Sequence, residues 1–210
     1  MRYLFLHPNF PGQFLHVARH LIKAGESVTG VGEHHNLQRQ VGMVTGARLL
    51  GYKIGRHASK TTHHYIKGTE DNVIRAQATL RLCLALKREG YRPDVIAAHK
   101  GWGDTLFLRE VFPEARIAGY LEFYYRGHGA DIGFDPEFPM SLDNRLEVKM
   151  KNATALLAWE DCDAVWTPTR WQASLFPSDL RHRLQIQHEG VDTTQVKPDF
   201  SAKAMLPGGT

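Results

Sequence analysis

The sequence has few cysteines and no long apolar run. Among 210 residues there are two cysteines, Cys83 and Cys162, each within an apolar stretch and far from the other. This usage is typical of buried free thiols and fits a reducing cytoplasm. No apolar run approaches the roughly 18 residues of a membrane-spanning helix, and residues 3–6 are too short for the apolar core of a signal peptide. We therefore expect a soluble, cytoplasmic protein, or at most one peripheral to the cytoplasmic membrane.

Dense charge of one sign is also missing. The 26 basic and 22 acidic residues leave a net charge of +4, spread along the chain without a basic run. This balance tolerates an anionic ligand or an anionic membrane surface, but it gives no reason to expect a nucleic-acid partner. Hydrophobic residues make up 42% of the chain, which is enough for one globular domain with a buried core.

Several motifs with a known chemistry are absent. The chain contains no GxGxxG sequence, no Walker sequence and no GxSxG turn. His16 and His20 have the i, i+4 spacing of a helical metal pair, but the glutamate of HExxH is missing and no third ligand is evident. We therefore expect no metal and no cofactor.

Strands and helices alternate along the chain. Periodicity predicts strands at 2–7, 27–32, 47–54, 93–99, 115–123, 163–169 and 183–190. It predicts helices at 13–25, 72–89, 103–112, 142–162 and 170–177, with 33–46 as a loop. Six or seven strands joined by helices favour a Rossmann-like α/β fold, in which helices cover both faces of a mostly parallel sheet. We predict one domain over 1–190, whereas 191–210 loses its periodicity and indicates a linker or tail.

Polar residues follow the predicted strands at the points where these end. In parallel sheets, ligands bind at the carboxyl ends of the strands. The residues at these positions, besides His7 and Trp102, are Gly12, Gln13, His99, Lys100, Glu122, Tyr124, Tyr125, Arg126 and Arg170.

Each of these residues also has a structural interpretation. Gly12 opens a helix whose amides can hold an anion, but glycine also serves a turn conformation. His99 is either catalytic or a hydrogen-bonded structural histidine. Lys100 and Arg126 suit a phosphate, or they are solvated charges at the rim of a crevice. Glu122 is a base or a hydroxyl-binding group, unless a salt bridge to Arg126 explains it.

Five segments, in this order, resemble the N-terminal half of a glycosyltransferase family 4 enzyme. They are HPNFPGQFLHVARHL, PDVIAAHKGWGDTLFL, GYLEFYYRGHGADIGFDPEFP, DAVWTPTRWQASLFP and EGVDTTQVKPD, and the match covers residues 1 to about 198. The resemblance implies the acceptor-side half of a GT-B fold, in which two Rossmann-like domains face one another. It also implies a retaining hexosyl transfer from a nucleotide diphosphate sugar to an acceptor hydroxyl.

The resemblance gives roles to particular positions. Gly12 matches the glycine that approaches the donor phosphate and the acceptor, and we place Gln13 beside it in substrate binding. His99 matches the histidine that faces the reacting sugar, and we assign catalytic roles to His99 and Glu122. The acceptor side and its rim are formed by Lys100, Tyr124, Tyr125, Arg126 and Arg170. The family often has a second histidine where this chain has Ala97, so no role that requires both is assigned.

In the family, a C-terminal domain supplies most nucleotide contacts, and 191–210 resembles the crossing toward it. We expect this domain as a partner, an inactive isolated chain, and self-association if the apolar surface facing that domain stays exposed. Two alternatives stay open: a stand-alone sugar- or anion-binding domain, and part of a sugar-nucleotide epimerase. The donor sugar, its base and the acceptor are not determined by these residues.

Overall fold

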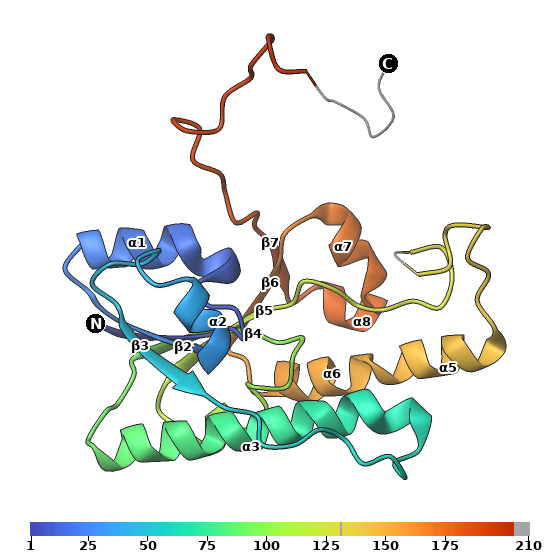
Figure 1. Ribbon diagram of the computed structural model, residues 1–210, viewed down its shortest axis with the longest axis horizontal. Coiled ribbons are helices and arrows are strands. Elements are labelled where there is room, and N and C mark those ends of the chain that lie inside the picture. Colours follow the sequence, from blue (N-terminus) through green and yellow to red (C-terminus); the bar gives the residue numbers. More distant parts are fainter. Residues whose placement is uncertain (131, 204–210) are drawn as a thin grey trace.

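A computed structural model describes residues 1–130 and 132–203. Within these residues, seven strands form one sheet in the order β3-β2-β1-β4-β5-β6-β7, and every neighbouring pair is parallel (Figure 1). The strands are β1 (Arg2–Leu6), β2 (Ser27–Glu33), β3 (Arg48–Tyr52), β4 (Val95–His99), β5 (Arg116–Tyr120), β6 (Ala164–Thr167) and β7 (Leu184–Ile186). The predicted Rossmann-like α/β fold is confirmed.

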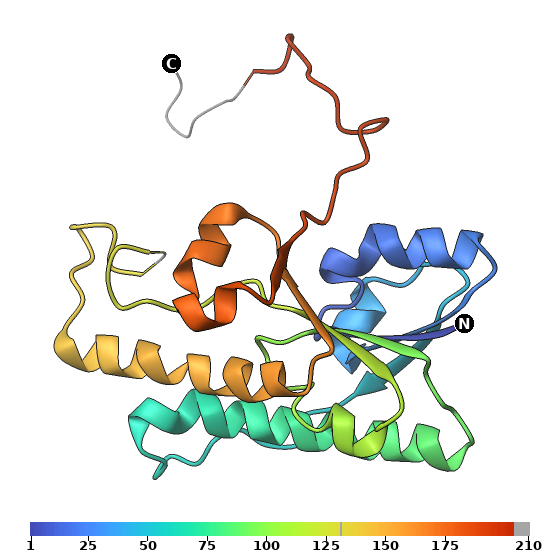
Figure 2. The same ribbon diagram turned by 180° about the vertical axis from the view of Figure 1, so that it is seen from behind.

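Helices cover both faces of the sheet. Two 3-10 turns, η1 (Gly12–Phe14) and η2 (His64–Ile66), precede longer helices. The α-helices are α1 (Leu15–Lys23), α2 (His34–Arg39), α3 (Lys67–Arg88), α4 (Leu108–Val111), α5 (Leu142–Met150), α6 (Asn152–Glu160), α7 (Arg170–Leu175) and α8 (Ser178–Arg181). In two opposite views, α1 lies on one side of the sheet, while α3 and α6 run side by side on the other (Figures 1 and 2).

Alternation along β1 explains why both faces are covered. Leu4 and Leu6 pack into a core on the side of α3 and α6, whereas Phe5 packs into a second core under α1. Successive side chains of a strand point to opposite faces, so a continuously apolar strand needs cover on both. The same alternation decides where each polar residue goes at the end of its strand.

Several helices differ from the prediction, among them α4, which is shorter than the helix predicted over 103–112. The segment predicted as a loop over 33–46 contains α2, because Leu37 is buried against the core under α1. The helix predicted over 142–162 is two helices that meet at Lys151. α3 begins five residues before the predicted start at 72, and α8 was not predicted.

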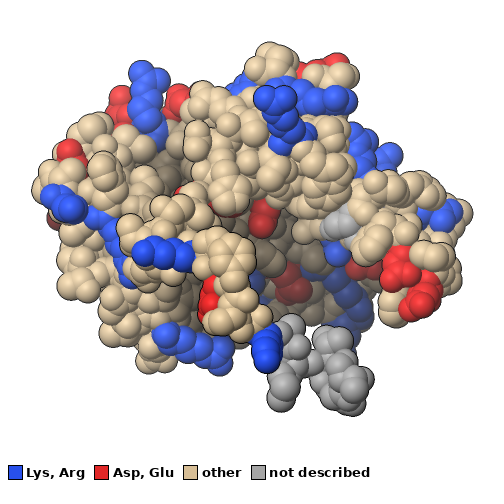
Figure 3. Space-filling model, turned by 90° about the horizontal axis from the view of Figure 1, so that it is seen from above, with Lys and Arg blue, Asp and Glu red and all other residues tan. Residues whose placement is uncertain are grey.

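The carboxyl ends of the strands lie at one edge of the sheet because all of them are parallel. After β7, the chain up to residue 203 extends away from the domain (Figure 1), and residues 204–210 lie outside the described residues. None of the described helices has the length and hydropathy needed to cross a bilayer. Lysine and arginine are scattered over the face seen from above rather than gathered in one patch (Figure 3).

Candidate functional site

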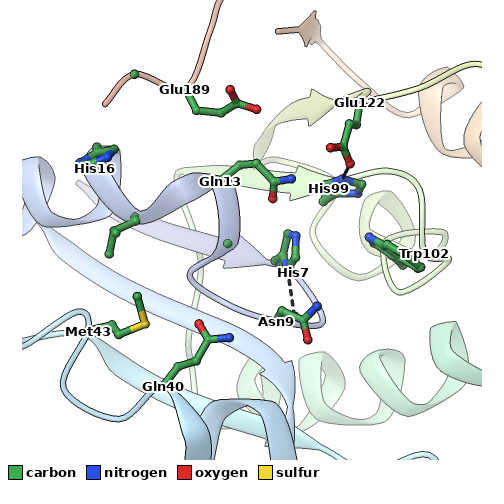
Figure 4. Close-up of a pocket in the computed structure, with 13 residues that line it drawn as sticks. His7, Asn9, Gln13, His16, Gln40, Met43, His99, Trp102, Glu122 and Glu189 are labelled. Carbon is green, nitrogen blue, oxygen red and sulfur yellow. Dashed lines mark hydrogen bonds and ion pairs between the residues drawn. The ribbon is translucent and has the colours of Figure 1, made fainter. Parts of the chain in front are cut away.

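A cavity of about 540 Å³ opens at the carboxyl ends of β1, β4 and β5. Figure 4 shows its labelled side chains, which come from segments far apart in the sequence. The cavity is lined by His7, Asn9, Gly12, Gln13, Leu15, His16, Gln40, Met43, His99, Trp102, Glu122, Glu189 and Gly190. Four of the predicted site residues, Gly12, Gln13, His99 and Glu122, therefore meet in one place.

The turn after β1 brings His7 and Gly12 together. Gly12 has a φ of +47°, and a Cβ atom there would lie 2.8 Å from Nε2 of His7. Glycine is therefore required for its conformation and for the close approach of the imidazole ring. The Nδ1 atom of His7 accepts the Asn9 amide at 2.8 Å, which leaves Nε2 protonated in the neutral ring. Burial, followed by the nearby His99, lowers the pKa of His7 from 6.5 to about 4, so the ring is neutral at pH 7.

His99 and Glu122 form a hydrogen-bonded pair at the ends of β4 and β5. The Gly101 amide donates to His99 Nδ1 at 3.1 Å, so the neutral ring carries its proton on Nε2. This Nε2 lies 3.1 Å from Oε2 of Glu122 (Figure 4). Both nitrogens of His99 are thereby occupied, and only 3% of its side chain is exposed.

Glu122 presents its carboxylate to the cavity. Its side chain is 41% exposed, whereas that of His99 is nearly covered. The hydrogen bond from His99 holds the pKa of Glu122 below its usual value, so Glu122 is ionised at neutral pH. The predicted alternative, a salt bridge from Glu122 to Arg126, is not formed, because the Arg126 guanidinium donates to the Leu175 carbonyl instead, at 2.7 Å. Glu122 is therefore the acidic group available to a ligand, and His99 positions it.

Two further side chains complete the cavity wall. Gln13 lies between His7 and Glu122 (Figure 4), and hydrogen bonding with its amide opposes the fall in the pKa of His7 and lowers that of Glu122. Glu189 comes from the segment after β7 and accepts a short hydrogen bond from the Tyr120 hydroxyl. This bond ties the end of the domain to the sheet beside the cavity.

Lys100 lies elsewhere, so its predicted position at the rim of the crevice is wrong. Its amide donates to the Tyr120 carbonyl at 2.9 Å, which continues the β4 pairing by one residue. Alternation then directs the Lys100 side chain to the opposite face from His99, where it is fully buried near Cys162. A side chain without exposed atoms cannot bind a phosphate.

The other predicted residues are spread around the domain. Tyr124 packs on Phe176 and carries the Arg126 guanidinium 4.9 Å above its ring, and neither Tyr124 nor Arg126 lines the cavity. Arg170 is exposed at the start of α7 and also lies outside the cavity lining. Tyr125 lines two smaller cavities next to the main one.

Sequence reasoning assigned no role to several lining residues. His7 and Trp102 carried a usable signal, because His7 ends one predicted strand and Trp102 lies three residues after another. Gln40, Met43 and Glu189 carried none, because their position depends on how distant loops fold back. Among the described residues, no group of three or more His, Cys, Asp or Glu side chains is arranged to hold a metal ion. The lining contains three histidines and two glutamates, but neither lysine nor arginine.

The fold and this cavity define a Rossmann-like domain with a polar ligand site at its strand ends. A profile of the glycosyl transferase family 4 group matches residues 24–196, and the chain belongs to this family. No curated protein matches the sequence.

Solved glycosyltransferases share the fold. MurG of Acinetobacter baumannii is 11% identical with a TM-score of 0.53, and the match covers 91% of this chain and 46% of MurG. Os79 of O. sativa in complex with UDP is 14% identical with a TM-score of 0.57, over 88% of this chain and 50% of Os79. An anthocyanidin 3-O-glucosyltransferase with UDP is 10% identical with a TM-score of 0.56, over 95% and 55%. This chain thus spans about half the length of the structures it matches, as expected for one half of a GT-B fold.

Proposed function

We propose that this chain is the acceptor-side domain of a retaining hexosyltransferase. The reaction moves a sugar from a nucleotide diphosphate sugar to an acceptor hydroxyl. The observation that carries the proposal is the meeting of His7, His99 and Glu122 in one cavity, in a chain that belongs to glycosyl transferase family 4. The presence of UDP in the structures of Os79 and of the anthocyanidin glucosyltransferase supports a nucleotide sugar as the donor.

Glu122 has the main catalytic role in this proposal. Sugar transfer develops positive charge at the anomeric carbon, and a fixed carboxylate stabilises that charge or accepts a hydrogen bond from the attacking hydroxyl. His99 keeps Glu122 ionised and oriented through the Nε2 contact at 3.1 Å. The Gln13 amide, which contacts both His7 and Glu122, provides a second polar group for a sugar hydroxyl beside Glu122.

The pyrophosphate leaving group needs positive charge that this domain lacks in its cavity. Pro11 precedes η1 without a side-chain cap, so the first amides of that turn are available to a phosphate oxygen. The lining contains no lysine or arginine, and Glu122 and Glu189 add negative charge. We therefore assign neutralisation of the pyrophosphate to basic side chains of a second domain rather than to a metal or cofactor.

The domain also has an apolar surface that a second domain could cover. An apolar groove of about 430 Å³ lies beside α1, with Phe14, Val17 and Trp166 in its lining. Such a surface favours contact with a second domain, or self-association when that domain is missing. We place the enzyme in the cytoplasm, where it acts on its own or at the inner membrane surface.

Substitution of His99 and of Glu122 tests the proposal, and the assay uses the full-length protein that the gene encodes. We would screen UDP-glucose, UDP-galactose, UDP-N-acetylglucosamine and GDP-mannose for transfer to saccharide and lipid-linked acceptors. Glu122→Gln and His99→Ala should each lower kcat by about 10²- to 10⁴-fold, because the first removes the carboxylate at the developing charge and the second removes the imidazole that holds this carboxylate in place. Glu114→Gln, a change at an exposed carboxylate far from the cavity, is the matched control.

A near-normal rate in Glu122→Gln would overturn the assigned role. NMR of the product anomer reads retention directly, and an inverted product would contradict the proposed stereochemistry. Isomerised nucleotide sugar without a transfer product would favour the epimerase alternative. Ligand binding without turnover by the gene-encoded protein would favour a binding domain.

A further inference from the structure

Trp102 stands where the main cavity meets two smaller ones. It lines the main cavity together with His99 and Glu122. The same three residues line a hollow of about 40 Å³ next to it. Beyond this hollow, Trp102 also lines a cavity of about 200 Å³, here called the side pocket. The three cavities are therefore neighbours, with Trp102 in the wall of each.

The side pocket is built between the start of α3 and the junction of α5 and α6. Its lining comprises Tyr65, Gly68, Thr69, Asn72, Gly101, Trp102, Tyr125, Glu147 and Lys151. It shares Gly101, Trp102, Tyr125 and Lys151 with the small hollow. These shared residues join the side pocket to the candidate site.

The loop that carries Trp102 is fixed against α3. The Trp102 carbonyl accepts a hydrogen bond from Arg75 at 3.0 Å, and Arg75 also pairs with Glu33 at 3.0 Å. Gly103 has a φ of +84°, and a Cβ atom there would lie 2.5 Å from Asn72. The loop therefore packs against α3 by its backbone, which holds the indole, 44% exposed, at the junction of the cavities.

The wall of the side pocket that contains Tyr125 is held by hydrogen bonds between the Asn152 side chain and the Tyr125 backbone. The buried Asn152 side chain accepts the Tyr125 amide at 2.8 Å and donates to the Tyr125 carbonyl at 2.9 Å. The ammonium of Lys151 lies 5.4 Å above the Tyr125 ring. Asn152, the first residue of α6, thereby fixes the backbone of Tyr125 in this wall.

The lining has the chemistry of a saccharide site. Tyr65, Trp102 and Tyr125 supply aromatic faces on which the C–H surface of a pyranose ring can pack. The edge of the pocket also has hydrogen-bond donors and acceptors, including one acidic and one basic side chain: Thr69, Asn72, Glu147 and Lys151. Such a lining suits a ligand with many hydroxyl groups better than an apolar ligand. The volume of about 200 Å³ is enough for one sugar ring, and Trp102, which also lines the main cavity, places a neighbouring ring close to Glu122.

We propose that the side pocket is an acceptor subsite, and that the acceptor is an oligosaccharide of at least two units. One unit occupies the side pocket, and the neighbouring unit presents its hydroxyl at Glu122. The name acceptor subsite rests on the proposed function, because only a transferase has an acceptor. Saccharide binding in the side pocket does not depend on transfer.

Saccharide binding to this chain tests the assignment without a donor or turnover. The probes are methyl glycosides of glucose, galactose, mannose and N-acetylglucosamine, with disaccharides made of the same sugars, titrated by saturation-transfer difference NMR. At least one disaccharide should bind about tenfold or more tightly than the methyl glycosides of its units, because it fills two subsites.

A bulky residue at Gly68 should remove this gain. Gly68 lines the side pocket, has no φ strain, and has open space where a Cβ atom would lie, so Gly68→Phe fills the pocket without disturbing the fold. Gly55→Phe makes the same change in equally open space outside the pocket. Glu147→Ala is a second, smaller variant that removes one hydroxyl partner.

The expected pattern is loss of the disaccharide preference in Gly68→Phe, a reduction in Glu147→Ala and full retention in Gly55→Phe. The subsite assignment is overturned if no disaccharide binds more tightly than its units, or if Gly68→Phe keeps the preference. A normal transfer rate in Glu122→Gln would instead remove the proposed function, and it would leave the saccharide subsite standing as a binding site.

Discussion

His99 and Lys100 are consecutive residues at the end of β4, yet their side chains lie in opposite surroundings. His99 belongs to a cavity cluster with His7 and Glu122, on the α1 side of the sheet. Lys100 belongs to a buried cluster with Asp104 and Cys162, on the α3 and α6 side. One residue of β-strand register therefore separates a group that can meet a ligand from one that cannot.

The two clusters also differ in how their polar atoms are satisfied. In the cavity cluster, His7 accepts a backbone amide, and His99 contacts both a backbone amide and Glu122. In the buried cluster, Lys100 Nζ and Asp104 Oδ1 have no hydrogen-bond partner within the described residues.

Burial disfavours the charged forms in the buried cluster. It raises the pKa of Asp104 from 3.8 to about 6 and lowers the pKa of Lys100. Perturbed pKa values are thus found in both clusters, but only one cluster lies at a cavity open to ligands. Position relative to the cavity is the better guide to function here.

The largest expected effect concerns His7 and the pH dependence of stability. Folded His7 has a pKa of about 4, against 6.5 for the exposed group. The unfolded chain therefore takes up this proton first as the pH falls, and the His7 contribution by itself should lower the free energy of unfolding by about 3 kcal/mol between pH 7 and pH 4.

His7→Asn keeps an acceptor for the Asn9 amide but does not titrate in this range. Between pH 7 and pH 4, the free energy of unfolding measured with urea should therefore fall less in the variant than in the original protein. The difference between the two losses is the contribution of His7. Equal losses in the two proteins would mean that His7 is not held neutral by the cavity cluster.

The next largest effect concerns Gly119, which leaves room for the buried cluster of Lys100, Asp104 and Cys162. A Cβ atom at Gly119 would lie 2.6 Å from Cys162 Sγ and 3.2 Å from the Lys100 side chain. Gly119→Ala should lower the free energy of unfolding by about 1–3 kcal/mol through overpacking. Gly55→Ala, in open space, is the control, and Cys162→Ala in the Gly119→Ala background should restore part of the loss. An unchanged melting temperature in Gly119→Ala would contradict the packing described.

The smallest expected effect is that of Lys100→Met, which should change stability but not the transfer rate. Lys100→Met replaces a buried ammonium by an apolar side chain of similar length, and it should raise the free energy of unfolding by about 1 kcal/mol. The transfer rate should not change, because Lys100 does not line the cavity. Lys53→Met, at an exposed lysine, should leave stability unchanged. A fall in the transfer rate of Lys100→Met would place Lys100 at the site after all.

Much of the fold could be predicted from local patterns. The strands at 2–7 and 93–99 are continuous apolar runs with a turn or helix signal after them, and their parallel pairing follows from the helices between them. The division of the helix at Lys151 has no local signal, and neither has the contact of Asn152 with Tyr125, 27 residues earlier. Helical periodicity alone continues through that point.

Part of the site could be predicted as well. Gly12, Gln13, His99 and Glu122 were placed correctly because each follows a strand end, and parallel strands bring their ends together. Lys100 was misplaced although the alternation of β4 held the information, since Ile96, Ala98 and Lys100 share one face. Tyr124 and Arg126 were expected at the acceptor side, but they pack against Phe176 and the Leu175 carbonyl.

The sequence by itself determined the parallel sheet, its two covered faces and the edge at which polar residues gather. These follow from periods of two and 3.6 residues, which are local properties of the chain. Only the tertiary structure decided that Glu122 pairs with His99 rather than Arg126, that Glu189 closes the cavity, and that Trp102 opens toward a second pocket. Those outcomes depend on distances between segments 23 or more residues apart, such as His99 and Glu122, and such distances are set by packing of the whole domain.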